Sequence, residues 1–316
     1  MKGTVYKSTG SWYTVKSVAG DFYPCRIKGK FRIQGIKSTN PVAVGDKVEF
    51  ETEIHDQEEV GLITEILDRQ NYIIRKSVKL SKQTHIIASN IDQVFLLITL
   101  KNPKTYTVFI DRFLATAEAY SIPAILLFNK VDECSEEEMA EVVKLAEVYR
   151  AINYTCLLIS AITGEGVKEV MELMEGKTNM FAGNSGVGKT TLINRIAPEL
   201  DLRTTETSEM HMQGQHTTTF AEMYDLDFDA RIIDTPGIRG FGIVDMDADE
   251  IGDYFPELFA IKGECKFNDT LHLEEPKCAV KAALEEGKIS TSRYHSYVQM
   301  ITGEDDTYRM DIFDEG

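Results

Sequence analysis

The sequence predicts a multidomain protein with an N-terminal β-barrel of the OB-fold type, a central α/β P-loop domain and a small helical C-terminal domain. Three observations support this fold class. Short strand-like runs broken by turn residues fill residues 1–70, apolar strands alternate with amphipathic helices over residues 71–245, and strand signals stop in residues 246–316. A chain of 316 residues is long enough for two or three domains of the usual size, about 100 to 200 residues each. We therefore expect three domains with these bounds.

The N-terminal domain has the pattern of a small β-barrel. Within residues 25–33 apolar side chains alternate with Arg and Lys, which places the cations on one face of the strands. An OB-fold surface for nucleic acid needs such a face, and an ordinary solvated strand face has the same pattern. We predict strands at residues 3–7, 12–17, 22–27, 31–34 and 46–52.

The central domain has the alternation of a parallel α/β sheet. Helices fill the gaps between its strands, and the clearest helix begins at Ser135, where Ser135 and Glu138 fit a capping box. We predict strands at residues 91–99, 124–128, 155–160, 179–182, 218–225 and 231–234.

Charge is unevenly distributed along the chain. The formal net charge is −17, but residues 1–47 hold nine Lys or Arg against two Asp or Glu. Residues 71–85 add four cations and no acid, so the remainder of the chain is strongly acidic. An acidic body with a basic N-terminal domain indicates that one face meets a polyanion while the rest repels it.

Composition also indicates the compartment. The longest apolar run, residues 94–100, is far too short to span a bilayer, and the N-terminus has no signal-peptide core. Five cysteines over this length do not form a disulfide framework, which fits a reducing environment. We expect a cytoplasmic protein that does not bind a membrane.

A complete phosphate-loop motif lies in the second half of the central domain, between an apolar strand and an expected helix. Its glycines let backbone N–H groups approach phosphate oxygens. Lys189 neutralises the β- and γ-phosphates, and the Thr190 hydroxyl is placed to bind Mg²⁺. We expect the nucleotide to contact Gly183, Asn184, Ser185, Gly186, Val187, Gly188, Lys189, Thr190 and Thr191.

A second nucleotide motif, Asp-Thr-Pro-Gly at residues 234–237, ends a strand. Asp234 can hold Mg²⁺ through water, and the Gly237 N–H can sense the γ-phosphate. A simple strand-terminating turn has the same residues. Together with the phosphate loop, the motif indicates a nucleoside triphosphatase.

The base is specified by Asn129, Lys130, Val131 and Asp132, which directly follow the strand at residues 124–128. The Asp132 carboxylate can accept hydrogen bonds from guanine N1–H and N2–H₂, and adenine does not offer this pair of donors. A helix cap after a strand is the alternative interpretation.

One strand later, Ser160 and Ala161 begin a loop that resembles the one whose backbone N–H closes over guanine O6 in small GTPases. Conventional G domains have the phosphate loop first and the guanine motif last, whereas here the guanine motif comes first. The sequence therefore predicts a circularly permuted domain that binds GTP and hydrolyses it to GDP and phosphate.

These motifs and their order resemble the RsgA family, also called YjeQ or YloQ, of circularly permuted bacterial GTPases. The resemblance covers nearly the whole chain. It implies an OB-fold domain, a permuted G domain and a zinc-binding C-terminal domain. It also implies late maturation of the 30S ribosomal subunit, with 16S rRNA, GTP and GDP as partners of a monomer. Further matching segments are residues 40–46, 90–93, 216–219, 278–281 and 293–297.

The switch segment departs from conventional GTPases. The resemblance implies that one of three threonines at residues 217–219, which we assign to Thr218, binds Mg²⁺. Ile238 occupies the position of the glutamine that orients the attacking water in Ras-like enzymes, so another group must do so. His216 is our candidate, and ordinary packing of the switch loop is the alternative role. A nucleotide-gated rRNA-binding factor with incidental hydrolysis is the alternative function.

The predicted zinc loop lacks one ligand. The family pattern implies ligands at residues 265, 270, 272 and 278, and these are Cys265, Thr270, His272 and Cys278. A threonine hydroxyl is a poor zinc ligand, so either Asp269 or water completes a zinc site, or packing holds the loop with two free thiols.

The final helical segment contains Arg293, Tyr294, His295 and Tyr297. These side chains either stack on rRNA or cap the last helices. Since the segment after Asp234 leads directly into the C-terminal domain, we also expect the nucleotide state to be transmitted there.

Overall fold

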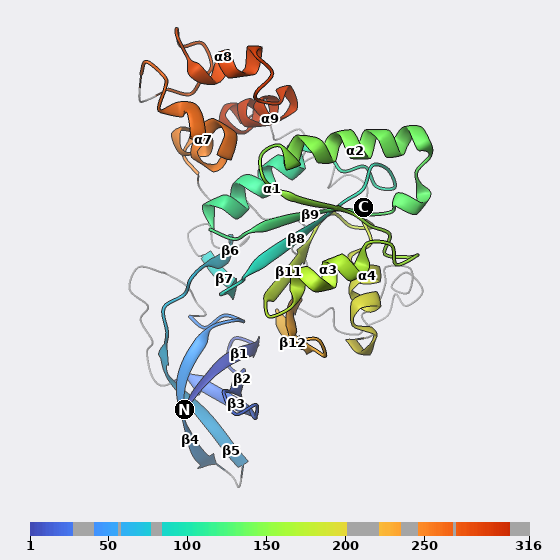
Figure 1. Cartoon of the computed structure of the whole chain (residues 1–316). Helices are drawn as coiled ribbons and strands as arrows, with labels where there is room; N and C mark the ends of the chain where they lie inside the picture. Colours follow the sequence, from blue (N-terminus) through green and yellow to red (C-terminus); the bar gives the residue numbers. More distant parts are fainter. Residues whose placement is uncertain are drawn as a thin grey trace.

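The structure, a computed structural model, describes residues 1–27, 41–55, 58–76, 84–200, 221–234, 246–267 and 270–303. Figure 1 shows a strand barrel at one end, an α/β body in the middle and a helical unit at the other end. None of the helices within these residues has the length and apolar character needed to cross a membrane. The three-part fold class predicted from the sequence is confirmed.

The N-terminal part is a closed barrel. Its strands lie in the order β1-β2-β3-β5-β4, and pairing of β1 with β4 closes the cylinder. Apolar side chains alternate into its interior, where Val5, Val15, Phe50 and Ile63 are fully buried. The strands are β1 (Lys2–Ser8), β2 (Tyr13–Ser17), β3 (Phe22–Ile27), β4 (Lys47–His55) and β5 (Glu58–Ile66).

The fifth barrel strand is β5, which the sequence pattern did not predict. It begins with two glutamates and contains Gly61, so its alternation of apolar side chains is weak. A Cβ on Gly61 would lie 2.3 Å from the Cys25 sulfur, so the missing side chain makes room for a core thiol. The strand predicted at residues 31–34 lies outside the described residues.

The central domain contains a six-stranded sheet in the order β10-β9-β8-β11-β13-β12, parallel except for β12. All six strands were expected, with bounds that differ by a few residues. A two-stranded hairpin of β6 (Tyr72–Lys76) and β7 (Thr84–Ser89) was not predicted. The sheet strands are β8 (Gln93–Ile98), β9 (Ala124–Phe128), β10 (Thr155–Leu158), β11 (Thr178–Ala182), β12 (Glu222–Leu226) and β13 (Ala230–Asp234).

Helices cover both faces of this sheet, as parallel strands require. The first face packs on α1 (Thr107–Ala119) and α2 (Glu136–Arg150), and the second packs on α3 (Val167–Met174) and α4 (Lys189–Ile196) (Figure 1). The predicted capping box is present at the start of α2. Ser135 Oγ accepts from the Glu138 N–H at 3.2 Å, and the Glu138 carboxylate accepts from the Ser135 N–H at 2.8 Å.

A buried carboxylate joins the barrel to the central domain. Asp46 is fully buried and accepts two hydrogen bonds of 2.6 Å from the Arg69 guanidinium and one of 2.6 Å from the Ser89 hydroxyl. Gly45 has φ +91°, and a Cβ there would lie 2.0 Å from the Ser89 carbonyl oxygen. The Asn90 side chain donates to the Gly45 carbonyl at 2.9 Å. Gly45 and Asp46 on the barrel side, with Ser89 and Asn90 on the other side, therefore hold the two domains together.

The C-terminal part is helical and packs through α9 on α1 of the central domain. Within it, α7 supplies Glu257 and α9 supplies Arg293, which is 1% exposed. The Arg293 guanidinium donates to both oxygens of Glu257, at 2.7 and 3.0 Å, and to Asp111 of α1 at 2.9 Å. Its helices are α6 (Ala248–Ile251), η3 (Gly252–Tyr254), α7 (Pro256–Lys262), α8 (Ala279–Glu285) and α9 (Thr291–Thr302).

The burial of side chains on α9 shows which of them could contact rRNA. Arg293 and Tyr297 are each 1% exposed, so they pack inside the protein and are not available to stack on rRNA. His295 is exposed and Tyr294 is half-buried.

We expect Arg69→Met to lower the free energy of unfolding of the barrel by about 3 to 5 kcal/mol, because Asp46 would stay buried without its cation. Urea unfolding followed by the fluorescence of Trp12, the only tryptophan of the chain, measures this change. Lys2→Met is the matched control, since the Lys2 pair with Glu49 is largely exposed and its loss should have little effect. Equal losses in both variants would contradict the prediction.

Asp111 should make the stability of the junction between α1 and α9 depend on pH. Burial raises the pKa of Asp111, although Arg293 and Tyr149 act in the opposite direction. A carboxyl group whose pKa is raised on folding stabilises the protein while it is protonated and loses this contribution as the pH rises.

Asp111→Asn removes that titration. The stability of Asp111→Asn relative to the unmodified protein should therefore increase between about pH 4, where an ordinary Asp loses its proton, and about pH 8. Urea midpoints of both proteins at the two pH values test this. Asp249→Asn, at an exposed site on α6, is the control, and a difference for Asp111→Asn that is independent of pH would refute the expectation.

Candidate functional site: a guanine nucleotide site

The phosphate-loop motif lies where its sequence context predicts, between the end of β11 and the start of α4. Gly183 has φ +137° and Gly188 has φ +98°, a region that favours glycine. A Cβ on Gly183 would lie 2.7 Å from the Leu97 carbonyl oxygen, and one on Gly188 would lie 2.4 Å from Asn129 Nδ2. The close approach of Leu97 on β8 to Gly183, and of the Asn129 side chain to Gly188, therefore requires glycine at both positions.

The lysine of this loop folds back across it. Lys189 Nζ donates to the carbonyl oxygens of Gly183 at 2.5 Å and Asn184 at 2.9 Å, so its charge lies over the loop backbone. Thr190 and Thr191 follow in the first turn of α4 and are half-buried. The first turn of α4 lies within the described residues 84–200 and contains no acidic side chain. A helix N-terminus preceded by glycines and free of local acid attracts a phosphate group.

Asn129 joins three motifs that are far apart in the sequence. It follows β9, and its side chain is 5% exposed. Its Oδ1 accepts from the Ala161 N–H at 2.9 Å, and its Nδ2 donates to the Val187 carbonyl at 2.7 Å. One carboxamide thus connects the guanine motif, the loop after β10 and the phosphate loop. The sequence assigned Asn129 to the site but gave no signal for this linking role.

The rest of the guanine motif forms a short turn. Lys130 has φ +66°, and its Nζ donates to the Asn102 carbonyl at 2.5 Å. Val131 is buried, while Asp132 lies in η1 (Val131–Glu133) with an exposed side chain. The Asp132 carboxylate is therefore accessible to a ligand while its backbone is held by the buried Val131.

Two further segments complete this edge of the sheet. Ser160 is fully buried, and its Oγ accepts from the Thr163 N–H at 3.0 Å, which fixes the loop after β10. The segment after β8 was missed, because no local motif marks it. It contacts Lys130 through Asn102, and a Cβ on Gly186 would lie 3.4 Å from Pro103.

The second nucleotide motif is only partly described. Asp234 is the last residue of β13, which lies beside β11, so its half-buried side chain belongs to the same sheet edge as the phosphate loop. The carboxyl edge of an open parallel sheet is the usual place for a ligand. The remaining predicted residues, Gly237, His216 and Thr218, lie outside the described residues.

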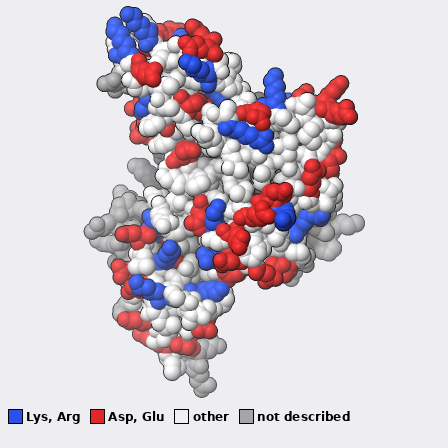
Figure 2. All heavy atoms as spheres, in the orientation of Figure 1, with Lys and Arg blue, Asp and Glu red and all other residues white. Residues whose placement is uncertain are grey.

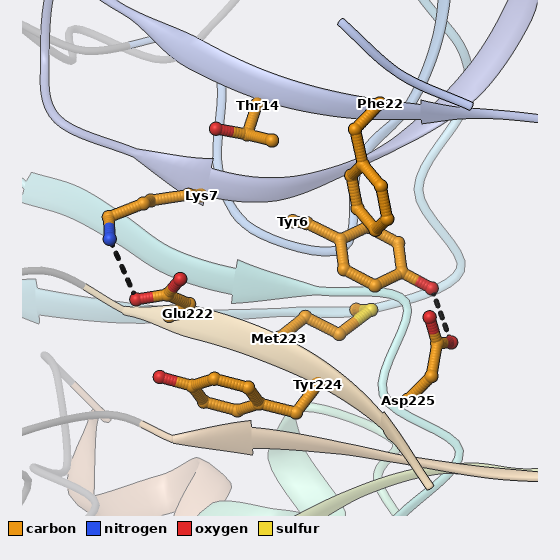
Figure 3. Close-up of a pocket in the computed structure, with 8 residues that line it drawn as sticks. All are labelled: Tyr6, Lys7, Thr14, Phe22, Glu222, Met223, Tyr224 and Asp225. Carbon is orange, nitrogen blue, oxygen red and sulfur yellow. Dashed lines mark hydrogen bonds and ion pairs between the residues drawn. The ribbon is translucent and has the colours of Figure 1, made fainter. Parts of the chain in front are cut away.

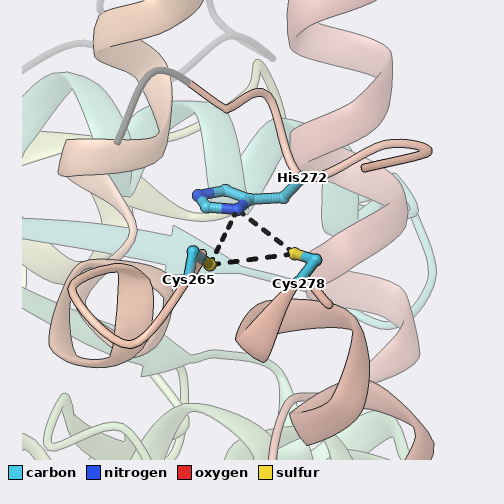
Figure 4. Close-up of side chains that lie close together, drawn as sticks. All are labelled: Cys265, His272 and Cys278. Carbon is cyan, nitrogen blue, oxygen red and sulfur yellow. Dashed lines mark hydrogen bonds between the residues drawn. The ribbon is translucent and has the colours of Figure 1, made fainter. Parts of the chain in front are cut away.

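The three zinc-loop residues other than Thr270 come together (Figure 4). The Cys265 and Cys278 sulfurs are 3.9 Å apart, and His272 Nδ1 lies 3.7 Å from the first and 3.4 Å from the second. Zinc–ligand bonds of about 2.3 Å to sulfur and 2.0 to 2.1 Å to nitrogen imply tetrahedral edges of roughly 3.5 to 3.8 Å. The three side chains therefore fit three corners of a zinc site.

Helix α9 holds this loop in place. The Tyr294 hydroxyl donates to the His272 carbonyl at 2.7 Å, and the Tyr297 hydroxyl donates to the Leu271 carbonyl at 2.8 Å. Burial lowers the pKa of His272, which favours the neutral imidazole that a metal needs. Burial raises the pKa of Cys278, so a cation beside it is needed to keep it as a thiolate.

A separate pocket of about 310 Å³ lies where the barrel meets β12 (Figure 3). Lys7 of β1 pairs with Glu222 at 2.9 Å, and Asp225 accepts from Tyr6 at 2.6 Å. Phe22 stands edge-on to Tyr6 with the ring centroids 5.3 Å apart. The pocket contains none of the described phosphate-loop or guanine-motif residues. Its paired side chains come from the barrel and from β12, so the pocket lies at a junction between domains. Its lining is Tyr6, Lys7, Thr14, Phe22, Glu222, Met223, Tyr224 and Asp225.

Of the cations predicted to form one face of the barrel, within residues 25–33, only Arg26 lies in the described part of the chain. Lys2, Lys7 and Lys16 pair with carboxylates, and Figure 2 shows Lys and Arg interspersed with Asp and Glu on the visible face. Four other cations of the N-terminal segment lie in residues 28–40, outside the described part. Arg26 stacks on Trp12 with its guanidinium carbon 3.9 Å from the ring centroid, and Trp12 is 38% exposed.

The fold and the site together define a P-loop GTPase in which the guanine motif precedes the phosphate loop along the chain. Comparisons with known proteins agree with this class. Residues 66–244 match the RsgA GTPase family, and residues 2–63 match the RsgA N-terminal domain. The chain belongs to the RsgA family of circularly permuted GTPases.

Relatives match over almost the full length. The small ribosomal subunit biogenesis GTPase RsgA of Christiangramia forsetii is 67% identical over 313 residues, which cover 99% of each chain. The crystal structure of YjeQ from Thermotoga maritima has a TM-score of 0.78 at 35% identity, covering 96% of this chain and 97% of that one. That of YloQ, a circularly permuted GTPase, has a TM-score of 0.75 at 30% identity, covering 97% of this chain and 95% of that one.

Asn129→Ala should weaken GDP binding by at least about tenfold, because it leaves the Ala161 N–H and the Val187 carbonyl without partners and separates the two loops. Isothermal titration with GDP measures this. Lys144→Ala, at an exposed site on α2, is the control and should bind normally. Unchanged affinity in Asn129→Ala would show that the carboxamide does not hold the site.

Proposed function

We propose that this chain is a GTPase that binds the small ribosomal subunit and assists its late maturation, hydrolysing GTP to GDP and phosphate. The observation that carries the proposal is the Asn129 carboxamide, which holds the guanine motif against the phosphate loop. The 67% identity to a protein named small ribosomal subunit biogenesis GTPase supports the ribosomal role.

The phosphate end of the site would use Lys189 and the first turn of α4. The ammonium group would exchange its two carbonyl partners for the β- and γ-phosphate oxygens, and the amides at the helix start would bind the same groups. Thr190 and Asp234 would hold Mg²⁺, directly and through water, with Thr218 as a third contact. This ion would neutralise charge that develops on the phosphate oxygens.

The base end would use Asp132 for discrimination. Its exposed carboxylate would accept from guanine N1–H and N2–H₂, while the Ala161 region closes over O6. Adenine would leave the carboxylate without matching donors, which disfavours ATP.

Hydrolysis would depend on a group outside the conventional position, since Ile238 has no hydrogen-bonding side chain. We propose that His216 orients the attacking water and that Gly237 senses the γ-phosphate. Slow intrinsic turnover is expected in the absence of an activator, and the ribosomal subunit would provide the activation.

The three predicted domains, 1–70, 71–245 and 246–316, would divide the work. The barrel would meet 16S rRNA through its cations and the Trp12–Arg26 stack, because guanidinium and aromatic faces stack on bases. The helical unit would provide a second contact and hold zinc through Cys265, His272 and Cys278. We propose that the chain acts as a monomer in the cytoplasm, where the ribosome is assembled.

Purified 30S subunits should accelerate GTP hydrolysis many-fold, and the acceleration should weaken as salt rises, since cation contacts to phosphates release counterions. Phosphate release measured with and without subunits over a salt series tests this. Asp132→Ala should lose turnover by losing GTP affinity, while Lys144→Ala should behave as the unmodified chain. Tight GTP binding without stimulation would instead favour a nucleotide-gated rRNA-binding factor.

A further inference from the structure

The Cys/His cluster offers a metal three ligands. Cys265, His272 and Cys278 form the one group of this kind found within the described ranges, where every ligand atom lies within 4.8 Å of the others. A zinc ion held by four protein ligands is closed, whereas one held by three keeps a position for a small molecule. The identity of the fourth ligand therefore decides what kind of site this is.

The neighbouring hydroxyl groups are engaged elsewhere. Thr270 Oγ1 accepts from the His272 N–H at 3.0 Å, which directs it at the backbone of its own loop. The Tyr294 and Tyr297 hydroxyls donate to backbone carbonyls at 2.7 and 2.8 Å. Neutral hydroxyls are also poor ligands for zinc compared with thiolate or imidazole. None of these three groups is arranged to complete a tetrahedron.

The fourth donor has to reach a cluster that is mostly buried, which favours a small one. Cys278 and His272 are buried and Cys265 is half-buried, so Cys265 lies on the least enclosed side of the cluster. Zinc with two thiolates and a neutral imidazole has no net charge, and a third thiolate would add one negative charge. Lys281 of α8 donates through Nζ to the Leu273 carbonyl at 2.7 Å, so a cation lies against the loop that holds His272, and the Glu275 carboxylate acts on the same histidine. The soft character of zinc favours sulfur as the added donor.

We propose that this chain binds zinc through Cys265, His272 and Cys278 only, and that a small exogenous donor takes the fourth position. Water occupies it by default and a low-molecular-weight monothiol, as thiolate, replaces the water. The inference rests on the zinc site included in the proposed function. The zinc would then hold the loop together through its three protein ligands and would also exchange its fourth ligand with solution.

The test uses the full-length chain loaded with Co²⁺, which reports its ligands by absorption, and β-mercaptoethanol as the probe. The thiolate-to-cobalt band should rise saturably by about one half as two thiolates become three. Thr270→Cys should already have the stronger band without the probe and should not respond to it. Thr270→Cys should also release zinc to a chelator more than about tenfold more slowly.

Thr270→Val is the matched control, because it removes the hydroxyl and keeps the shape of the side chain. It should have the band of the unmodified protein and the same response to the probe. A changed band would assign the hydroxyl as a ligand and overturn the proposal. The proposal would also be overturned if the unmodified protein did not respond to β-mercaptoethanol and the Asp269→Ala variant did, since Asp269 would then be the fourth ligand.

Metal content and GTP hydrolysis are measured on the same samples. Less than one bound zinc or cobalt per chain would overturn the inference. If GTP hydrolysis persists in that case, only the metal site fails and the proposed GTPase function stands.

Discussion

The nucleotide site depends on the parallel arrangement of β9, β8, β11 and β13, whose carboxyl ends lie at one edge of the sheet. Sheet order is set by packing and pairing of strands, so the motifs meet at that edge whatever their order along the chain. Circular permutation places the ends of the domain at a different loop and leaves the arrangement of the strands at this edge unchanged. Asn129 then fixes the distance between two of these loops with one carboxamide.

Buried ion pairs fix how the three parts are joined. Asp46 with Arg69 and Arg293 with Glu257 and Asp111 are almost completely removed from water. Such pairs contribute little net stability, but removing one partner is costly because the other charge stays buried. We infer that their role here is to specify one arrangement of the domains, since both groups lie at a junction and the Arg69–Asp46 and Arg293–Glu257 pairs use a planar, two-point geometry.

The sequence predicted those features that depend on local pattern. The capping box at Ser135, the strand before the phosphate loop and the guanine motif after β9 were all found where expected. Features decided by distant contacts were not predicted. Gly61 weakens the pattern of β5 because it accommodates a thiol from another strand, and the partners of Arg293 lie 36 and 182 residues away in the sequence. Local periodicity carries no information on such pairs.

The pairing of β1 with β12 has a consequence for synthesis on the ribosome. Lys7 and Glu222 lie 215 residues apart, so the barrel has emerged long before its docking strand exists. Domains generally fold in order from the N-terminus as the chain is made. The guanine loop is likewise complete before the phosphate loop is translated. The nascent chain therefore acquires a folded barrel first, and gains nucleotide affinity and the fixed domain arrangement only near the end of its translation.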